Sequence, residues 1–309
     1  MKIKAFIYII LAGILWGTSG LFVNFIKPYG LTSLQMTAAR GAISFLAMLI
    51  YAVIYSLIKK KSGLFKFKPI NFLFFIPIGI TLFSTAALYY SSMQLTSVST
   101  AVVLMYMAPV YVMIFSVIFL KERLSTLKVI SLIAMLLGCC LVSGLIGGIK
   151  FDLIGIILGF LSGISYAIYN IITKIALKKN DAVFTTAWSF LFMAVIAAVS
   201  SKPHEIFTIA SKDPLPVIPL LLGLGIATFV TPYFLYTLAM RDLPAGTAAA
   251  LGIIEPMAAT VFSIIFLNEK LTVLPAIGII LILLAVFMLG KAEGGKKLKK
   301  DKLKQNELH

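Results

Sequence analysis

The segment TAVVLMYMAPVYVMIFSVIFLKERL, residues 100–124, recurs in the second half of the chain as TAAALGIIEPMAATVFSIIFLNEKL, residues 247–271. The two segments align without a gap at an offset of 147 residues, and 11 of the 25 positions are identical. An apolar alphabet produces chance identities, but it does not explain why Pro109 recurs as Pro256 in the middle of the segment. Weak internal repeats of this kind mark duplicated membrane folds. The chain therefore contains an internal duplication.

The composition places this duplication in a membrane protein. The chain has 309 residues, of which 61% are hydrophobic and 12% charged, and its mean hydropathy is +1.05. Soluble domains are nearer half apolar and a quarter charged. The net charge of +16 would suit a nucleic-acid-binding protein, but the Lys residues lie in short loops and a tail between apolar segments, as expected for membrane topology. Nucleic acid is therefore excluded as a partner.

Ten segments are long and apolar enough to cross a bilayer, which takes about 20 residues. The predicted fold is an all-α membrane protein with ten transmembrane helices. The C-terminal tail is too polar to pack into a core and is expected to be mobile. The predicted spans are 4–26, 33–58, 71–91, 97–119, 126–146, 153–177, 183–200, 216–238, 245–267 and 273–290.

The distribution of Lys and Arg predicts that both termini are cytoplasmic. With the N-terminus inside, 21 of the 27 basic residues fall in inner regions, five fall in outer loops, and Arg40 lies inside a span. This excess follows the positive-inside rule. The expected location is the cell membrane, with a multi-pass topology.

Each repeat unit holds five spans, so the second unit enters the membrane in the opposite sense to the first. The predicted domains are a first repeat over 4–146, a second over 153–290 and a cytoplasmic basic tail over 291–309. Loop charges agree, because the inner loop 59–68 carries five Lys, whereas its outer counterpart 201–213 balances two Lys with two acids. Inverted-topology repeats are a device of secondary transporters, which hold a site near the midplane between the repeats.

The same features resemble a known family. Two five-span units, each with a mid-span proline and a terminal FLKERL or FLNEKL, are similar to the EamA-type group of the drug/metabolite transporter superfamily. LAGILWGTSGLFVNF (11–25) and AARGAISFLAML (38–49) add to the resemblance, which covers residues 4 to about 290. It implies a ten-helix bundle whose central cavity is lined mostly by spans one, three, four, six, eight and nine. It says little about the substrate, since similar members are linked to amino acids, nucleotides, sugars and drugs.

Glu255 is the most informative single residue. It lies about ten residues into its span, roughly 15 Å at 1.5 Å per residue, and a charge at that depth is a functional-site candidate by default. Ala108 holds the equivalent position in the first repeat, so the carboxylate is not duplicated, whereas the helix-breaking Pro109 and Pro256 are. We interpret Glu255 as a site for a substrate amine or a coupling proton. The alternative is a buried carboxyl that hydrogen-bonds to a neighbouring helix.

Aromatic and amide side chains form a candidate lining for the cavity. Such side chains also act as interfacial anchors or packing contacts in lipid, but most of these lie on the spans that the family uses for its cavity. Aromatic walls with few polar groups suit small amphiphilic ligands. The predicted substrate-binding residues are Trp16, Tyr89, Tyr106, Tyr166, Tyr169, Asn170, Tyr236 and Glu255, from a wider set that includes Asn24, Tyr90, Tyr111 and Tyr233.

Other polar and small residues have mainly structural interpretations. Arg40 can snorkel, pair with Glu255 or bind an anionic substrate group, and we favour a role in packing and topology. Glu122 and Glu269 end equivalent spans, where exposed ion pairs or cap-like contacts explain them, with a gating role as the alternative. Spaced glycines favour close helix packing: Gly13, Gly17, Gly20, Gly155, Gly159 and Gly163.

These observations predict a secondary transporter that moves a small metabolite, an amino acid or related amphiphilic compound, in the direction of export by alternating access around a central cavity. The alternatives are a facilitative channel-like permease, although no filter-like stretch is present, and a non-transporting membrane scaffold. An enzyme is disfavoured because the chain has two His and no P-loop. No cofactor or metal is expected. The expected partners are the substrate and the lipid bilayer, with protons as candidate coupling ions, in a monomer or a homodimer.

Overall fold

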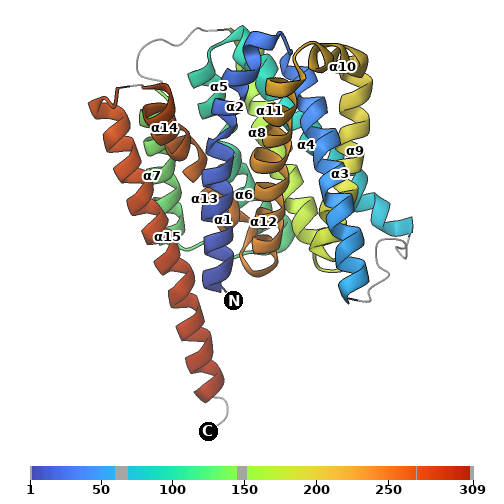
Figure 1. Ribbon diagram of the computed structural model, residues 1–309. Coiled ribbons are helices and arrows are strands. Elements are labelled where there is room, and N and C mark those ends of the chain that lie inside the picture. Colours follow the sequence, from blue (N-terminus) through green and yellow to red (C-terminus); the bar gives the residue numbers. More distant parts are fainter. Residues whose placement is uncertain (1, 60–68, 145–151, 269, 307–309) are drawn as a thin grey trace.

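The computed structural model is a bundle of helices that run roughly side by side (Figure 1). It describes residues 2–59, 69–144, 152–268 and 270–306, and these ranges contain no strand. The elements are α1 (Lys2–Gly17), α2 (Ser19–Ile26), η1 (Lys27–Tyr29), α3 (Ser33–Lys59), η3 (Pro69–Asn71), α4 (Phe72–Leu95), α5 (Val98–Met105), α6 (Ala108–Leu120), α7 (Thr126–Val142), α8 (Leu153–Ala176), α9 (Ala182–Ser201), α10 (Pro203–Lys212), α11 (Pro214–Gly225), η4 (Ile226–Val230), α12 (Thr231–Asp242), α13 (Ala245–Leu251), α14 (Ile254–Leu267) and α15 (Val273–Asn306).

The predicted ten-span membrane fold is confirmed. Over the described ranges, nine helical segments are long and apolar enough to cross a membrane, and Thr126–Val142 is a shorter apolar helix. Each predicted span coincides with one helix or with consecutive helices, such as α1 with α2 or α11 with η4 and α12. Large aliphatic side chains remain exposed on these helices, including Leu57, Val199 and Leu283. Exposed apolar surface on this scale fits lipid rather than water.

The duplicated segments form two broken helices that run in opposite directions. One is interrupted between Met105 and Ala108 and the other between Leu251 and Ile254. In Figure 1, α5 and α6 descend through the bundle, whereas α13 and α14 ascend. The segments also end alike, because Lys121 and Asn268, 147 residues apart in the chain, both have φ of 55° in the left-handed region. The sequence duplication is therefore a duplication of backbone conformation.

Close glycine contacts join the two repeats in equivalent ways. A Cβ placed on Gly17 of α1 would lie 2.7 Å from the Cβ of Ala258 on α14. A Cβ placed on Gly163 of α8 would lie 3.2 Å from the ring of Tyr111 on α6. Tyr111 and Ala258 are 147 positions apart in the sequence. The first helix of each repeat thus packs against the broken helix of the other repeat.

These contacts give a matched pair of stability variants. Gly17→Ala should lower the stability of the folded protein by about 1–3 kcal/mol, the usual cost of overpacking, because its Cβ would meet Ala258 and the backbone nitrogen of Ala259 at 2.8 Å. Gly20→Ala should be neutral or slightly stabilising, because no atom lies within 4 Å of its added Cβ and Ala favours helix. Thermal unfolding of both purified variants checks this, and equal midpoints would contradict the packing argument.

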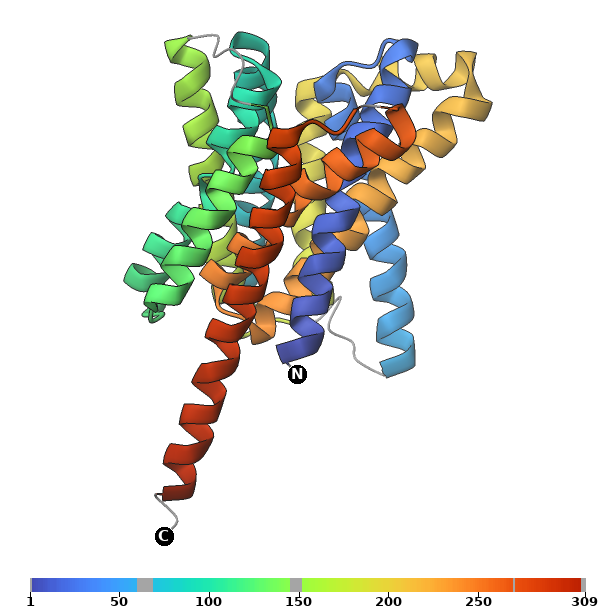
Figure 2. The ribbon, with the colours of Figure 1, turned by 90° about the vertical axis from the view of Figure 1, so that its left-hand side faces the viewer.

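The C-terminal helix departs from the expected tail. α15 continues as helix through Asn306 and projects beyond the bundle (Figure 2), over residues that were expected to form a separate tail from residue 291. Lys, Leu, Glu and Gln are strong helix formers, so a helix that begins as a span can continue past the bundle. The first turn past residue 290 is also part of the core, because Glu293 is 2% exposed. We call the end of the bundle near the N-terminus, from which α15 projects, the terminal face.

Candidate functional site

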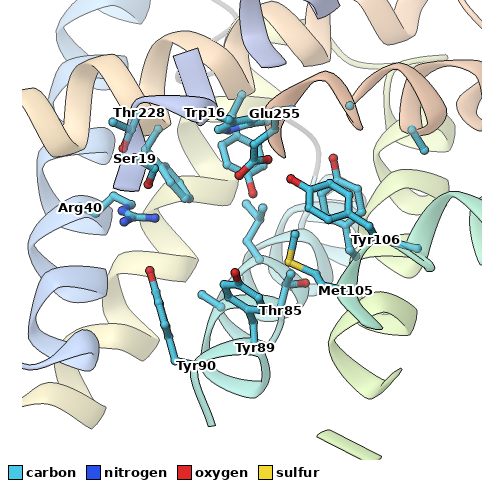
Figure 3. Close-up of a pocket in the computed structure, with 18 of the residues that line it drawn as sticks. Trp16, Ser19, Arg40, Thr85, Tyr89, Tyr90, Met105, Tyr106, Thr228 and Glu255 are labelled. Carbon is cyan, nitrogen blue, oxygen red and sulfur yellow. The ribbon is translucent and has the colours of Figure 1, made fainter. Parts of the chain in front are cut away.

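A cavity lies where the two broken helices meet α1, α3, α4, α8, η4 and α12 (Figure 3). Its empty volume is about 880 Å³, counting the part that opens to solvent. The lining residues come from the middle of the helices and from the half away from the terminal face. They are Trp16, Ser19, Arg40, Leu82, Thr85, Ala86, Tyr89, Tyr90, Met105, Tyr106, Ala108, Pro109, Tyr166, Thr228, Phe229, Tyr233, Ala249, Gly252 and Glu255.

The helix break places Glu255 at the cavity wall. Its amide donates to the Gly252 carbonyl at 3.0 Å, and its side chain lies in the first turn of α14. A helix N-terminus carries partial positive charge and stabilises a carboxylate there. Pro256 also falls in this first turn, where its lack of an amide hydrogen costs no intrahelical hydrogen bond. The proline therefore starts a new helix, as Pro109 does in α6, rather than kinking a continuous one.

Arg40 and Glu255 approach the cavity from different sides (Figure 3). The Arg40 guanidinium lies over the Phe229 ring at 5.6 Å from its centroid, a distance at which a cation and an aromatic face attract each other. Tyr106 neighbours Glu255 from the other broken helix. Within the described part of the chain, no ion pair within 4.0 Å joins Arg40 to Glu255. The cavity thus holds one positive and one negative group that do not neutralise each other directly.

The structure separates the predicted binding residues into two groups. Trp16, Tyr89, Tyr106, Tyr166 and Glu255 line the cavity, together with Tyr90 and Tyr233 of the wider set. Tyr169, Asn170 and Tyr236 lie one turn nearer the terminal face and are almost fully buried, with the Tyr236 hydroxyl donating to Asn170 Oδ1 at 2.5 Å. The second group forms a packed layer under the cavity. Asn24 and Tyr111 are not part of the lining.

Several lining residues were outside the predicted set. Arg40 is in the wall, although the sequence favoured a packing role for it. Thr228 and Phe229 are brought to the cavity by η4, a π-helical turn in which Thr231 donates its amide to the Ile226 carbonyl. Pro232 follows immediately and lacks an amide donor, which favours a widened turn before it. The sequence signal for this turn was Pro232 within an apolar span.

Charged side chains form hydrogen bonds with the backbone at the turn between α12 and α13, on the terminal side of the cavity. We call this turn the α13 corner. Lys174 donates to the carbonyls of Met240 and Leu243, and Glu122 accepts from the Ala245 amide at 2.8 Å. Glu122 therefore makes a cap-like contact across the repeats rather than only a surface ion pair. The equivalent Glu269 lies outside the described residues.

A buried ion pair secures the next turn of α13. Lys128 on α7 pairs with Glu293 on α15, and both side chains are 2–3% exposed. Thr247 accepts from Lys128 Nζ and donates to Glu293 Oε1, each at 2.8 Å. We call Glu122, Lys128, Lys174 and Glu293 the corner clamp. The clamp joins the terminal end of α13 to its neighbours, and α13 runs from there to Gly252 at the cavity.

The residues that the structure describes contain no cluster of three or more His, Cys, Asp or Glu that could hold a metal ion. The polar groups in the cavity are one guanidinium, one carboxylate, hydroxyls and an indole N–H. Such a set suits a site that binds a small organic molecule through a few polar contacts and apolar walls.

The fold and the cavity together define a multi-pass membrane protein with a cavity between its two related halves. The model of the EamA-like transporter family matches residues 3–144 and again residues 153–291. The chain belongs to this family.

Relatives of known sequence agree with this assignment. An uncharacterized transporter of Archaeoglobus fulgidus is 29% identical over 281 residues, covering 91% of this chain and 94% of that protein. The uncharacterized transporter YwfM of Bacillus subtilis is 24% identical and covers 94% of this chain and 95% of its own length. Solute carrier family 35 member G1 of Mus musculus is 26% identical, covering 85% of this chain and 71% of the mouse protein.

The fold also has a solved counterpart. A chain described only as "Crystal structure of protein" superposes with a TM-score of 0.76 at 18% identity, covering 93% of this chain and 96% of that one. At that identity, the match concerns the fold alone. The chain is therefore a membrane transporter by family, and its substrate and mechanism have to be argued from its own residues.

Proposed function

We propose that this protein is a secondary transporter that exports a small amphiphilic metabolite, an amino acid or a related compound, through its central cavity. The observation that carries the proposal is the position of the cavity at the two helix breaks, which belong to opposite repeats. Transporters with inverted repeats bind substrate at broken helices near the midplane. Aromatic walls with few charged groups suit a molecule that has an apolar body and a polar end.

Alternating access follows from the same symmetry. The positive-inside rule supports a cytoplasmic terminal face, and in this proposal the corner clamp closes that side. These features support an outward-facing state. If each repeat adopted the packing arrangement of the other, the outer side would close and the contacts of the corner clamp would break.

Counterflow in proteoliposomes tests this function. Vesicles that hold the intact protein and are preloaded with an unlabelled mixture of apolar amino acids should take up a labelled member of that mixture, with saturation, above the level of protein-free vesicles. Saturable counterflow identifies a carrier, because exchange needs a site that reorients. Non-saturable flux would indicate a channel-like permease, and no flux across a broad metabolite panel would indicate a scaffold.

A further inference from the structure

We propose that the cavity binds both charged ends of a zwitterion, with Arg40 receiving the carboxylate and Glu255 receiving the ammonium group. The proposal rests on the proposed function, because it names the substrate class of the same cavity. It also gives Arg40 a binding role where the sequence favoured packing and topology.

The first observation is that Arg40 has unused hydrogen-bond donors. Arg40 is 8% exposed, and its Nε and Nη2 atoms are closed to solvent and have no hydrogen-bond partner. A guanidinium stays charged in proteins, and a buried charge without a partner is costly. A guanidinium can bind the two oxygens of a carboxylate in a bidentate geometry. Because Arg40 lines the cavity, a ligand carboxylate there would give this charge the partner that the protein does not supply.

The second observation is that Arg40 is held in the cavity. The guanidinium lies over Phe229, and Figure 3 shows it pointing into the open space rather than along its helix toward the outer face. Phe229 is fixed in turn by the π-helical turn η4 and by ring contact with Tyr233 at 4.4 Å between centroids. Trp16 adds a third buried donor without a partner, its indole Nε1. The positive side of the cavity is thus preorganised.

The third observation is that the other charged group in the cavity lining is a carboxylate. Glu255 and Arg40 are the charged groups among the lining residues that the structure describes. An anion alone would leave Glu255 without a cationic partner, and a cation alone would leave Arg40 without an anionic one. A zwitterion satisfies both and adds no net charge to the cavity, which limits the desolvation cost. The apolar wall, with Leu82 and Met105, then faces an apolar side chain.

The experiment uses three probes of the same shape. Leucine carries both poles, 3-methylbutylamine lacks the carboxylate, and 4-methylpentanoate lacks the ammonium group. Thermal unfolding of the purified full-length protein reports binding, because a ligand that binds only the folded state raises the midpoint. Leucine should raise the midpoint at concentrations roughly ten- to a hundred-fold lower than either analogue, the cost of losing a charged hydrogen-bond partner.

Two variants make the test reciprocal. In Arg40→Gln, leucine and 3-methylbutylamine should bind alike, because the site for the carboxylate is gone. In Glu255→Gln, leucine and 4-methylpentanoate should bind alike. Arg40→Lys keeps the positive charge and should retain part of the preference for leucine over the amine, which keeps the test valid if the Gln variant does not fold.

Two results would overturn the assignment. One is an equal response of the unsubstituted protein to leucine and to either analogue, and the other is an unchanged preference in both Gln variants. Failure of the proposed function is a separate outcome, since it shows as absence of saturable counterflow for any solute. Saturable exchange of a solute that lacks the carboxylate or the ammonium group would support the proposed function and contradict the zwitterion assignment.

Discussion

Lys128→Met should lower the free energy of unfolding by about 3–5 kcal/mol, the usual result of removing one partner of a buried ion pair. Glu293 would then remain buried, at 2% exposure, and would keep the hydrogen bond from Thr247 while losing its ion pair with Lys128. The same change loosens α13 from α7 and α15 on the terminal side. Thermal or denaturant unfolding of the purified variant measures the loss.

Two controls separate burial from charge. Lys202 pairs with Glu205 at 3.5 Å on the surface, where Lys202 is 75% exposed, so Lys202→Met should cost less than about 1 kcal/mol. The double variant Lys128→Met with Glu293→Leu removes both buried charges and should recover most of the lost stability. If Lys128→Met costs no more than Lys202→Met, the buried pair does not stabilise the α13 corner.

The membrane spans and the helix breaks could be predicted from the sequence because both follow from local chemistry. A run of apolar residues marks a span wherever it occurs, and the repeated proline marks a break in both copies. Each predicted span has its helix, and the breaks at 106–107 and 252–253 lie just before Pro109 and Pro256. Local rules of this kind need no knowledge of neighbouring helices.

The corner clamp could not be predicted because its partners are distant in sequence. Lys128 counted only as an inner basic residue, and Glu293 fell in the segment taken as a tail. They are 165 positions apart, and only the packing of α7 against α15 brings them together. The same limit applies to the contact between Arg40 and Phe229. A π-helical turn brings Phe229 to the cavity, far from Arg40 in the sequence.

The aromatic lining was predicted by span and not by depth along the helix, which explains its division. Tyr166 and Tyr169 are three positions apart on α8, yet Tyr166 lines the cavity and Tyr169 packs beneath it. Tyr233 and Tyr236 on α12 differ in the same way. Depth along the helix, at about 1.5 Å per residue, decides which of two tyrosines lines the cavity. Whether these tyrosines bind substrate stays a prediction.

Glu255→Gln should reduce counterflow roughly ten- to a hundred-fold while leaving the unfolding midpoint without ligand close to that of the unsubstituted protein. The first expectation follows because the carboxylate supplies a charged partner, whose loss costs about 1.5–3 kcal/mol. The second follows because Glu255 is only partly buried and makes no ion pair within the described part of the chain. The measurement is initial exchange rate in proteoliposomes, normalised to reconstituted protein. Glu205→Gln is the matched control, since Glu205 lies on α10, outside the cavity lining, and the variant should exchange normally.

The pattern of loss also decides what Glu255 binds. If it holds the substrate ammonium group, Glu255→Gln loses counterflow and gradient-driven transport together, at every pH tested. If it holds only a coupling proton, counterflow persists and accumulation driven by a pH gradient is lost, because exchange needs no net proton movement. We expect the first result, since Glu255 lies in the same cavity as Arg40 and its carboxylate is not duplicated, Ala108 standing at the equivalent position of the first repeat. Normal counterflow with normal pH-driven accumulation in Glu255→Gln would remove Glu255 from the mechanism altogether.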